Sequence, residues 1–260
     1  MDEPWKRKEV IGDCTLYLGD CLEVMPVLGK VDAVVTSPPY NLGGFHTFKN
    51  GKREAHNYSK FKDDMGEDEY QAWQVEVCNF MGSITDGPIF YSHKNRIVSG
   101  EMVSPLEWLK RSNLRISQCV VLNKGSGANV DKVRFFPVHE LIYICFSGLG
   151  VLENNECLTD VWKVEQTNRK DAKHPAVMPM SAANNCISAT HAQTILDPFM
   201  GSGTTLVACA KLGRAGIGIE LDPDYFDIAC KRVEEAYRQP DMFVQADKTE
   251  PTQEGFDLGT

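Results

Sequence analysis

The sequence predicts an α/β domain built on a largely parallel sheet. Strand-like and helix-like segments alternate along most of the chain, which is the pattern of such domains. A glycine-rich turn at 197–203 stands between a short apolar strand and a helix, and a second strand and helix follow it. The chain has 260 residues, of which 42% are hydrophobic and 24% are charged, so it can bury the core of one large domain.

Apolar runs and turn residues place the elements of the first half of the chain. Strands are expected at 15–18, 31–36, 88–92, 116–122 and 140–146, and helices at 21–28, 68–82 and 105–110. Residues 41–65 show no clear periodicity and therefore predict a long loop. Long loops in compact domains are usually functional.

The second half opens with a polar, irregular stretch at 147–173, interrupted by a short apolar segment at 160–162. A more regular unit follows, with helices expected at 181–190, 204–212 and 223–238, and strands at 194–196 and 215–219. We therefore expect one domain over residues 1–238. Residues 239–260 carry five acidic residues and one lysine, which predicts an acidic, flexible tail.

The formal net charge of −9 opposes a nucleic-acid partner at first sight, but its distribution is uneven. Between residues 42 and 62, five basic residues stand against one glutamate. Charge alone favours a phosphate-binding loop and a solvated loop equally. The nine cysteines form no Cys-x-x-Cys pair, and we find neither a signal peptide nor a membrane-spanning run. We expect a cytoplasmic protein with reduced thiols, no membrane contact and no metal.

The glycine-rich turn is suited to a nucleoside ligand. Gly201 and Gly203 let a ligand approach the backbone at the start of a helix. A dinucleotide-binding turn would need a third glycine where Leu206 stands, and no Gly-Lys-Ser/Thr of a P-loop follows. Glu220 ends the next strand, where a ribose diol is usually bound, and Asp197 can accept from an ammonium or hydroxyl group. A purely structural turn capped by an acid is the alternative.

A proline pair follows the apolar strand that ends at Thr36. Pro38 and Pro39 have no N–H group and a fixed φ, so their carbonyls can only accept hydrogen bonds. Ser37 adds a hydroxyl group and Tyr40 a flat ring. These groups suit a planar amine that donates to Ser37 Oγ and to the Pro38 carbonyl while Tyr40 stacks on its ring. A plain turn or a peptide-ligand motif would show the same letters, but the position after a buried strand argues against an exposed ligand.

Taken together, residues 36–40 and 197–205 resemble two motifs of the DNA amino-methyltransferases: a (Ser/Asp/Asn)-Pro-Pro-(Tyr/Phe) catalytic motif and a Phe-x-Gly-x-Gly cofactor loop. The catalytic motif comes first, which is similar to the circularly permuted beta class. Three further stretches agree, at 19–21, 90–94 and 174–179. The resemblance covers about residues 10–238. It implies a Rossmann-like, seven-stranded, mostly parallel sheet with one antiparallel strand, S-adenosylmethionine as cofactor and double-stranded DNA as substrate.

The resemblance also implies roles for individual residues. The catalytic motif would be Ser37, Pro38, Pro39 and Tyr40. Cofactor contacts would come from Asp20, Thr36, His174, Pro175, Asp197, Phe199, Gly201, Ser202, Gly203, Thr204, Glu220 and Leu221. DNA contacts would come from Lys49, Lys52, Arg53, Lys60, Lys62, Lys124 and Arg134. The target-recognition region, at 147–173, is short, so either the recognised sequence is short or the 41–65 loop and the second subunit of a homodimer share the work.

The chemistry implied is methylation of an exocyclic amine on a flipped-out base. Accepting both amine protons at Ser37 and Pro38 returns electron density to the nitrogen and aims its lone pair. Carbon-5 methylation of cytosine would need a Pro-Cys dipeptide, which the chain lacks. Serine at the first motif position favours N4 of cytosine, with N6 of adenine as the alternative. A protein or RNA amino-methyltransferase fits the motif order less well, and an inactive nucleic-acid binder fits the intact motifs less well.

Overall fold

The computed structural model describes residues 3–42, 45–49, 52–56, 64–125, 133–153, 158–164 and 178–239, with the backbone alone at 45–49 and 52–56. Residues 240–260, which hold the predicted acidic tail, lie outside this range. Within the described ranges, no helix combines the length and the apolar character needed to cross a membrane.

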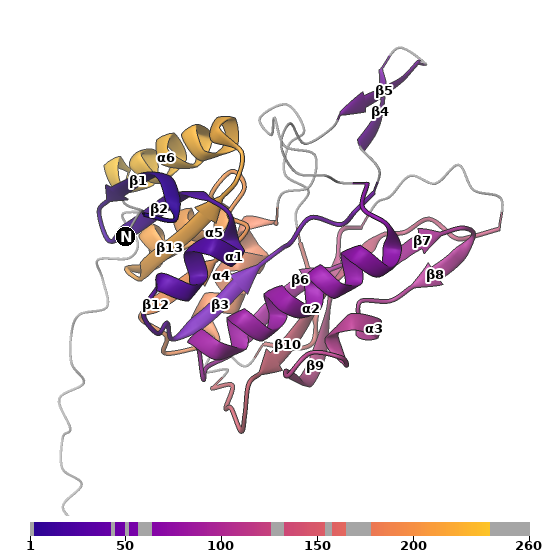
Figure 1. Cartoon of the computed structure of the whole chain (residues 1–260), viewed down its shortest axis with the longest axis horizontal. Helices are drawn as coiled ribbons and strands as arrows, with labels where there is room; N and C mark the ends of the chain where they lie inside the picture. The colour runs from indigo at the N-terminus through magenta and orange to yellow at the C-terminus, as the bar shows by residue number, and fades with distance from the viewer. Residues whose placement is uncertain are drawn as a thin grey trace, which may run out of the picture.

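The chain forms one large sheet, two separate hairpins and helices on both faces (Figure 1). The strands of the sheet are β1 (Trp5–Ile11), β2 (Cys14–Gly19), β3 (Ala33–Thr36), β6 (Ile89–His93), β9 (Arg115–Asn123), β10 (His139–Phe146), β11 (Val161–Lys163), β12 (Thr194–Asp197) and β13 (Ala215–Glu220). The hairpins are β4 (Phe45–Lys49) with β5 (Lys52–His56), and β7 (Arg96–Val98) with β8 (Glu101–Val103). The helices are α1 (Cys21–Val24), the 3-10 helix η1 (Met25–Val27), α2 (Glu67–Ile84), α3 (Leu106–Leu109), α4 (Met180–Ser188), α5 (Thr204–Leu212) and α6 (Pro223–Arg238).

The strand order of the sheet is β1-β2-β13-β12-β3-β6-β10-β9-β11. Neighbouring strands are parallel except where β1 meets β2 and where β10 meets β6 and β9. The seven strands from β2 to β9 form the sheet that the sequence predicts, and β10 is its antiparallel strand. The sheet is wider than predicted because β1 and β11 extend its two edges.

The sheet separates two apolar cores. Helices α4, α5 and α6 contribute to the first core and α1, α2 and α3 to the second, so both faces are covered (Figure 1). Successive residues of β3 alternate between them: Ala33 and Val35 lie in the first core and Val34 in the second. The same alternation separates Ile195 from Leu196 on β12. A strand buried on both sides has a continuous apolar sequence, which explains the uninterrupted runs in these segments.

Three elements differ from the sequence predictions. Strand β1 is not expected because most of its side chains are charged. Pairing with β2 and the contacts of Arg7 with α6 order it at the sheet edge. The β7–β8 hairpin is also unpredicted, since its strands are only three residues long. The prediction of a loop throughout 41–65 is wrong for the backbone of β4 and β5, which pair from Phe45–His56 to Lys49–Lys52. The Asn50-Gly51 dipeptide between them is typical of tight hairpins.

The order of the strands reverses between β12 and β3. From β12 the chain continues through α5 to β13 on one side, whereas β3 leads through α2 to β6 on the other. In open α/β sheets, ligands bind at the carboxyl ends of the strands where such a reversal occurs. Thr36 and Asp197 end the two strands at this point, although they are 161 residues apart in sequence. The fold thus brings the two predicted motifs to one edge of the sheet.

Candidate active site

A pocket opens at the carboxyl ends of β2, β3, β12 and β13. Its lining includes most of the residues predicted for catalysis and cofactor binding: Asp20, Ser37, Pro38, Pro39, Tyr40, Asp197, Phe199, Gly201, Ser202, Thr204, Glu220 and Leu221. Both motifs therefore face the same space, although the sequence gives no distance between them.

Some residues of the pocket are not among the predicted ones. Trp73 of α2 lines it, and its ring meets the edge of Phe199 with 5.5 Å between ring centroids. Cys21 and Met178 also line it. Helix α2 has the same amphipathic pattern whether Trp73 faces the pocket or the core. The sequence therefore carries no signal that identifies Trp73 as a pocket residue.

The glycine-rich turn holds its shape through two left-handed residues. Gly201 has φ of 51° and Gly203 has φ of 81°, conformations that residues with a side chain rarely adopt. Gly203 is the N-cap of α5, and a Cβ atom there would stand 2.9 Å from Cβ of Ala229, so the residue lets α5 pack against α6. Gly203 is not among the residues that line the pocket, and its contact with the cofactor stays a prediction. Arg232 of α6 holds the same turn, donating to Ser202 O at 2.5 Å and to Ser202 Oγ at 2.7 Å.

Gly203→Ala is expected to destabilise the protein by about 2–3 kcal/mol, since it adds both a left-handed conformation and an overlap with Ala229. Gly213→Ala is a matched control, because Gly213 also has a positive φ of 64° but nothing within 4 Å of its added Cβ. The control should lose only about 1 kcal/mol. Urea unfolding of both variants measures the difference; equal losses would show that the packing against Ala229 is unimportant.

Glu220 joins the glycine-rich turn to the end of β13. Its carboxylate accepts from Gly201 N at 2.9 Å and from Asp222 N at 2.8 Å, one hydrogen bond on each oxygen. Burial raises the pKa of Glu220 to about 7, although the two backbone N–H groups act in the opposite direction. Each oxygen keeps a further lone pair, so the carboxylate can hold a diol from the pocket. This is the arrangement expected of a ribose-binding acid.

Asp197 links the cofactor turn to the catalytic strand. Its carboxylate accepts from Thr36 Oγ1 at 2.8 Å, from Thr205 Oγ1 at 2.7 Å and from Phe199 N at 3.1 Å. Burial raises the pKa of Asp197 to about 6. Thr36 is fully buried and does not line the pocket, so the prediction that it contacts the cofactor is not supported by its position: its hydroxyl is used by Asp197. The hydroxyl groups that Asp197 binds are thus the protein's own.

The catalytic motif presents a hydroxyl and a carbonyl to the pocket. Ser37 Oγ lies 3.0 Å from the Tyr40 hydroxyl, and burial raises the pKa of Tyr40, which keeps that hydroxyl protonated. The Pro39 carbonyl accepts from the Tyr70 hydroxyl at 2.8 Å. Among the described residues, nothing donates to the Pro38 carbonyl. The Pro38 carbonyl is therefore available as an acceptor beside Ser37, and its role toward a substrate amine stays a prediction.

The ring of Tyr40 is 5% exposed. It packs on the ring of His93 with 4.5 Å between centroids, and the Lys94 ammonium lies 5.4 Å from its centre. A base stacked on Tyr40 would need more of this ring than the present conformation exposes.

Asp20 stands at the end of β2 on another wall of the pocket. Its Oδ1 caps α1 by accepting from Leu22 N at 2.8 Å. The cap leaves Oδ2 available to a ligand amine, which agrees with the predicted position near an adenine ring. His174 and Pro175, predicted to cover the methionine part of the cofactor, lie outside the described residues.

The predicted DNA-contacting residues are only partly placed. Lys49, Lys52 and Arg53 lie on the β4–β5 hairpin, which stands away from the body of the domain in Figure 1. Lys60 and Lys62 lie outside the described residues. Two downstream residues differ from each other: Lys124 forms an ion pair with Glu140, whereas Arg134 is exposed between β9 and β10.

Comparisons with known proteins give a consistent assignment. A family model described as DNA methylase matches residues 110–231, just under half of the chain. The Type II methyltransferase M.ScaI of Streptomyces caespitosus is 28% identical, over 85% of this chain and 82% of its own length. The Type II methyltransferase M2.MboI of Moraxella bovis is 26% identical, over 85% and 87%.

Solved structures share the fold. The PvuII DNA methyltransferase, described as cytosine-N4-specific, superposes with a TM-score of 0.69 at 14% identity, covering 90% of this chain and 95% of that one. The complex of M1.HpyAVI with S-adenosylmethionine superposes with a TM-score of 0.62 at 20% identity, covering 85% and 98%.

The fold, the pocket at its strand-order reversal and these similarities define a methyltransferase that uses S-adenosylmethionine. Within that class the chain is similar to the N4/N6 DNA methyltransferases, and the order of its motifs is that of their circularly permuted beta form. The residues fit the cofactor, because a buried carboxylate with spare lone pairs stands at the end of β13 and a second carboxylate at the end of β2. The catalytic strand β3 precedes the cofactor turn in sequence yet lies beside it in the sheet, which is the permuted order.

Proposed function

We propose that the protein methylates N4 of a cytosine flipped out of double-stranded DNA. The observation that carries the proposal is that Ser37, Pro38 and the glycine-rich turn line one pocket. An amine bound at the motif is then next to the cofactor site. Serine as the first motif residue supports cytosine, and so does the fold shared with the cytosine-N4-specific PvuII enzyme. The relatives named Type II methyltransferases support a role beside a restriction nuclease.

S-adenosylmethionine supplies an electrophilic methyl group when it is bound. Glu220 would hold its ribose and Asp20 would face its adenine. The backbone of residues 201–204 would accommodate the methionine part, since glycine there permits a close approach.

The motif residues hold the target amine and its protons. Ser37 Oγ and the Pro38 carbonyl each accept one N–H of the amine, which orients the nitrogen lone pair toward the cofactor side of the pocket. This role requires Ser37 to donate its own proton to the Tyr40 oxygen, 3.0 Å away, in a contact where either hydroxyl can be the donor. Tyr40 in turn hydrogen-bonds to Ser92, which is buried behind it. The hydroxyl chain thus leaves the lone pairs of Ser37 directed at the substrate.

The target base is tested by analysing DNA from bacteria that express the protein. The DNA is digested to nucleosides and the methylated nucleosides are identified by mass spectrometry. We expect N4-methylcytosine. Finding N6-methyladenine instead would overturn the proposed cytosine target. It would leave methylation of an exocyclic amine in place, because both reactions need the same acceptor pair.

The β4–β5 hairpin is proposed to contact the DNA backbone through Lys49 and Lys52, which pair at the end of the hairpin. Replacing both with alanine should weaken binding to all duplex sequences alike. It should also lower the slope of log affinity against log salt by about 0.9 for each phosphate that the variant no longer neutralises. Affinities at four salt concentrations give this slope.

Lys30→Ala with Lys211→Ala is the matched control. Lys30 precedes β3 and Lys211 ends α5, so both lie at the opposite edge of the sheet from the pocket. An unchanged slope in the hairpin variant, or an equal change in the control, would show that the hairpin does not contact the DNA backbone.

Target recognition is proposed to involve residues 147–173 together with the hairpin. In the described part of that region, β11 adds to the edge of the sheet beside β9. A homodimer that shares recognition stays a prediction, as does the single-domain boundary at 238. Sedimentation of the protein with and without a duplex containing its site tests the dimer.

A further inference from the structure

A chain of buried hydrogen bonds ends at the catalytic motif. Trp108 Nε1 donates to the Tyr91 hydroxyl at 2.9 Å, and that hydroxyl donates to Gln74 Oε1 at 2.7 Å. Gln74 Nε2 donates to the Tyr70 hydroxyl at 2.8 Å, which donates to Pro39 O at 2.8 Å. The four side chains are completely buried. Burying such polar groups costs free energy unless every one of them is hydrogen-bonded. Apolar side chains in the same place would therefore stabilise the fold at least as well.

The direction of this chain is fixed from Trp108 as far as Tyr70. An indole N–H can only donate, so the oxygen of Tyr91 accepts from Trp108 and the Tyr91 proton must go to Gln74. The amide of Gln74 therefore turns its NH2 group toward Tyr70. The Tyr70 hydroxyl has one proton and two acceptors, the Pro39 carbonyl and His93 Nε2, each 2.8 Å away, so the two acceptors share that proton.

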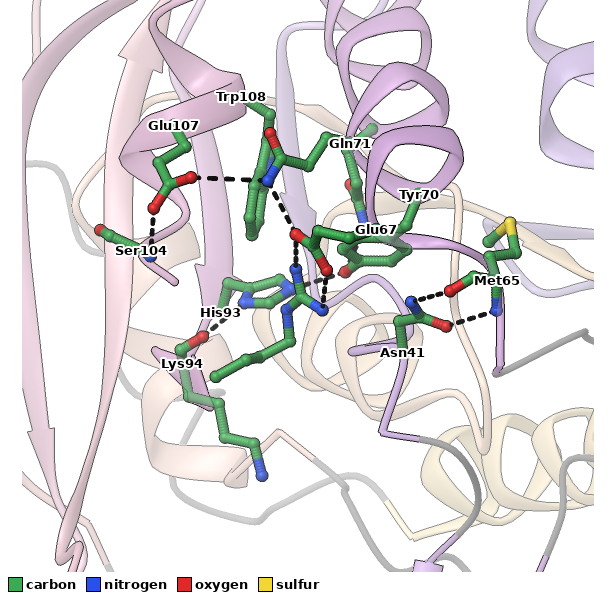
Figure 2. A network of polar contacts seen from close by, with 12 residues as sticks. Asn41, Met65, Glu67, Tyr70, Gln71, His93, Lys94, Ser104, Glu107 and Trp108 are labelled. Atoms are coloured by element: carbon green, nitrogen blue, oxygen red, sulfur yellow. Dashed lines mark hydrogen bonds and ion pairs between the residues drawn. The ribbon is translucent and has the colours of Figure 1, made fainter. Parts of the chain in front are cut away.

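His93 contacts both Tyr70 and Tyr40. Its Nδ1 lies 2.7 Å from the Lys94 carbonyl and therefore carries the ring proton, which makes Nε2, 2.8 Å from the Tyr70 hydroxyl, an acceptor. Burial lowers the pKa of His93 to about 3, so the ring is neutral. Figure 2 shows the His93 ring beside Tyr70. The His93 ring also packs on Tyr40, with 4.5 Å between centroids, so the Tyr70–His93 pair contacts the last two residues of the catalytic motif.

The Tyr70 ring is itself fixed. The guanidinium of Arg96 lies 4.4 Å from the ring centre and is 2% exposed. Glu67 holds Arg96 by two hydrogen bonds of 3.0 and 2.7 Å. Nearby, the side-chain amide of Asn41 forms two hydrogen bonds of 2.8 Å with the backbone of Met65 (Figure 2). These bonds tie the residue that follows the catalytic motif to the segment that precedes α2. Tyr70 can therefore shift little without losing its ring contact with Arg96.

We propose that Tyr70 is a positioning residue for methyl transfer: by holding the Pro39 carbonyl it turns the preceding peptide so that the Pro38 carbonyl and Ser37 face the target amine. The inference rests on the proposed function for its substrate, and on the hydrogen bonds alone for its geometry. Tyr70 does not line the pocket, so it touches neither substrate nor cofactor. It acts through Pro39.

Tyr70→Phe tests the proposal because it removes the hydroxyl and leaves the ring beneath Arg96. We expect kcat for DNA methylation to fall about tenfold, while cofactor affinity and the KM for DNA change less than about twofold. Tyr91→Phe is the matched control: it breaks the same chain one link earlier and leaves Tyr70 with both of its acceptors. The control should keep kcat within about twofold at a similar loss of thermal stability. Equal losses of kcat in the two variants would contradict the positioning role of Tyr70 and would show that it only stabilises the fold.

Hydrogen exchange of the free protein separates this proposal from the proposed function. In Tyr70→Phe, backbone amides of the peptide that contains Tyr40 and Asn41 should exchange several-fold faster than in the wild type or in Tyr91→Phe. This readout needs no DNA, so it holds even if the substrate proves to be different. Unchanged exchange would overturn the positioning role whatever the reaction. If Tyr70→Phe proves too unstable, Gln74→Leu removes the donor that orients Tyr70 and should change kcat and exchange in the same direction.

Discussion

Ser37→Ala is expected to lower kcat for DNA methylation about a hundredfold while the affinity for S-adenosylmethionine changes less than about twofold. The hydroxyl lies in the pocket and contacts the Tyr40 hydroxyl, and the cofactor loop is held by Glu220, Asp197 and Arg232 without it. Its loss should therefore affect the amine and spare the cofactor. Single-turnover rates with saturating cofactor, together with calorimetric titration of the cofactor, measure the two quantities.

Tyr40→Phe is the control for this prediction. It removes the group that takes the Ser37 proton and keeps the ring on His93. Its kcat should fall less than that of Ser37→Ala, because the Ser37 oxygen stays in place. If Ser37→Ala instead loses cofactor binding and keeps a normal rate once loaded, Ser37 supports the pocket and does not bind the substrate.

Glu220→Ala should weaken binding of S-adenosylmethionine by about 1–3 kcal/mol, or roughly 5- to 150-fold, because hydrogen bonds to a buried charged group are removed. The variant also frees Gly201 N, which Glu220 now binds. Calorimetry at pH 8, where the carboxyl group is ionised, gives the comparison. Equal affinity in the variant and the wild type would show that Glu220 does not bind the ribose.

The pH dependence of cofactor binding follows from the same carboxyl group. Burial raises the pKa of Glu220 to about 7, and a ribose diol donates to the ionised form. A proton on Glu220 must therefore leave before binding, so wild-type affinity should fall as the pH drops below 7, about tenfold between pH 7 and pH 6 at most. The Ala variant lacks this group and should be nearly flat over the same range. A wild-type profile that is equally flat would mean that the carboxyl group is ionised throughout or does not meet the ligand.

The sequence predicts the parts of the site whose chemistry is local. The proline pair and the glycine-rich turn each define their own backbone geometry, and the strand ends that carry Asp197 and Glu220 follow from hydrophobic runs. The seven central strands are predictable for the same reason. Each of these predictions depends on neighbours within a few residues.

Contacts between distant segments are what the sequence does not predict. Thr36 is adjacent to the catalytic motif in sequence, yet its hydroxyl is used by Asp197 across the sheet. Trp73 and Tyr70 lie three residues apart on α2, and only the packing of that helix against β6 and the motif shows that one lines the pocket and the other holds Pro39. Strand β1, rich in charge, is ordered by its partner β2 and by the contacts of Arg7 with Asp227 and Phe226 of α6. No local pattern in these residues differs from that of an ordinary core or surface.

The most direct test of the proposed reaction follows a labelled methyl group from S-adenosylmethionine to duplex DNA with purified wild-type protein and Ser37→Ala. The labelled DNA is digested and the nucleosides are separated. We expect the wild type to place the label on an exocyclic amino group, and Ser37→Ala to bind the cofactor normally but transfer the methyl group about a hundredfold more slowly. Label on carbon 5 of cytosine, label on protein or RNA but not on DNA, or equal transfer by the two proteins would contradict the proposed reaction.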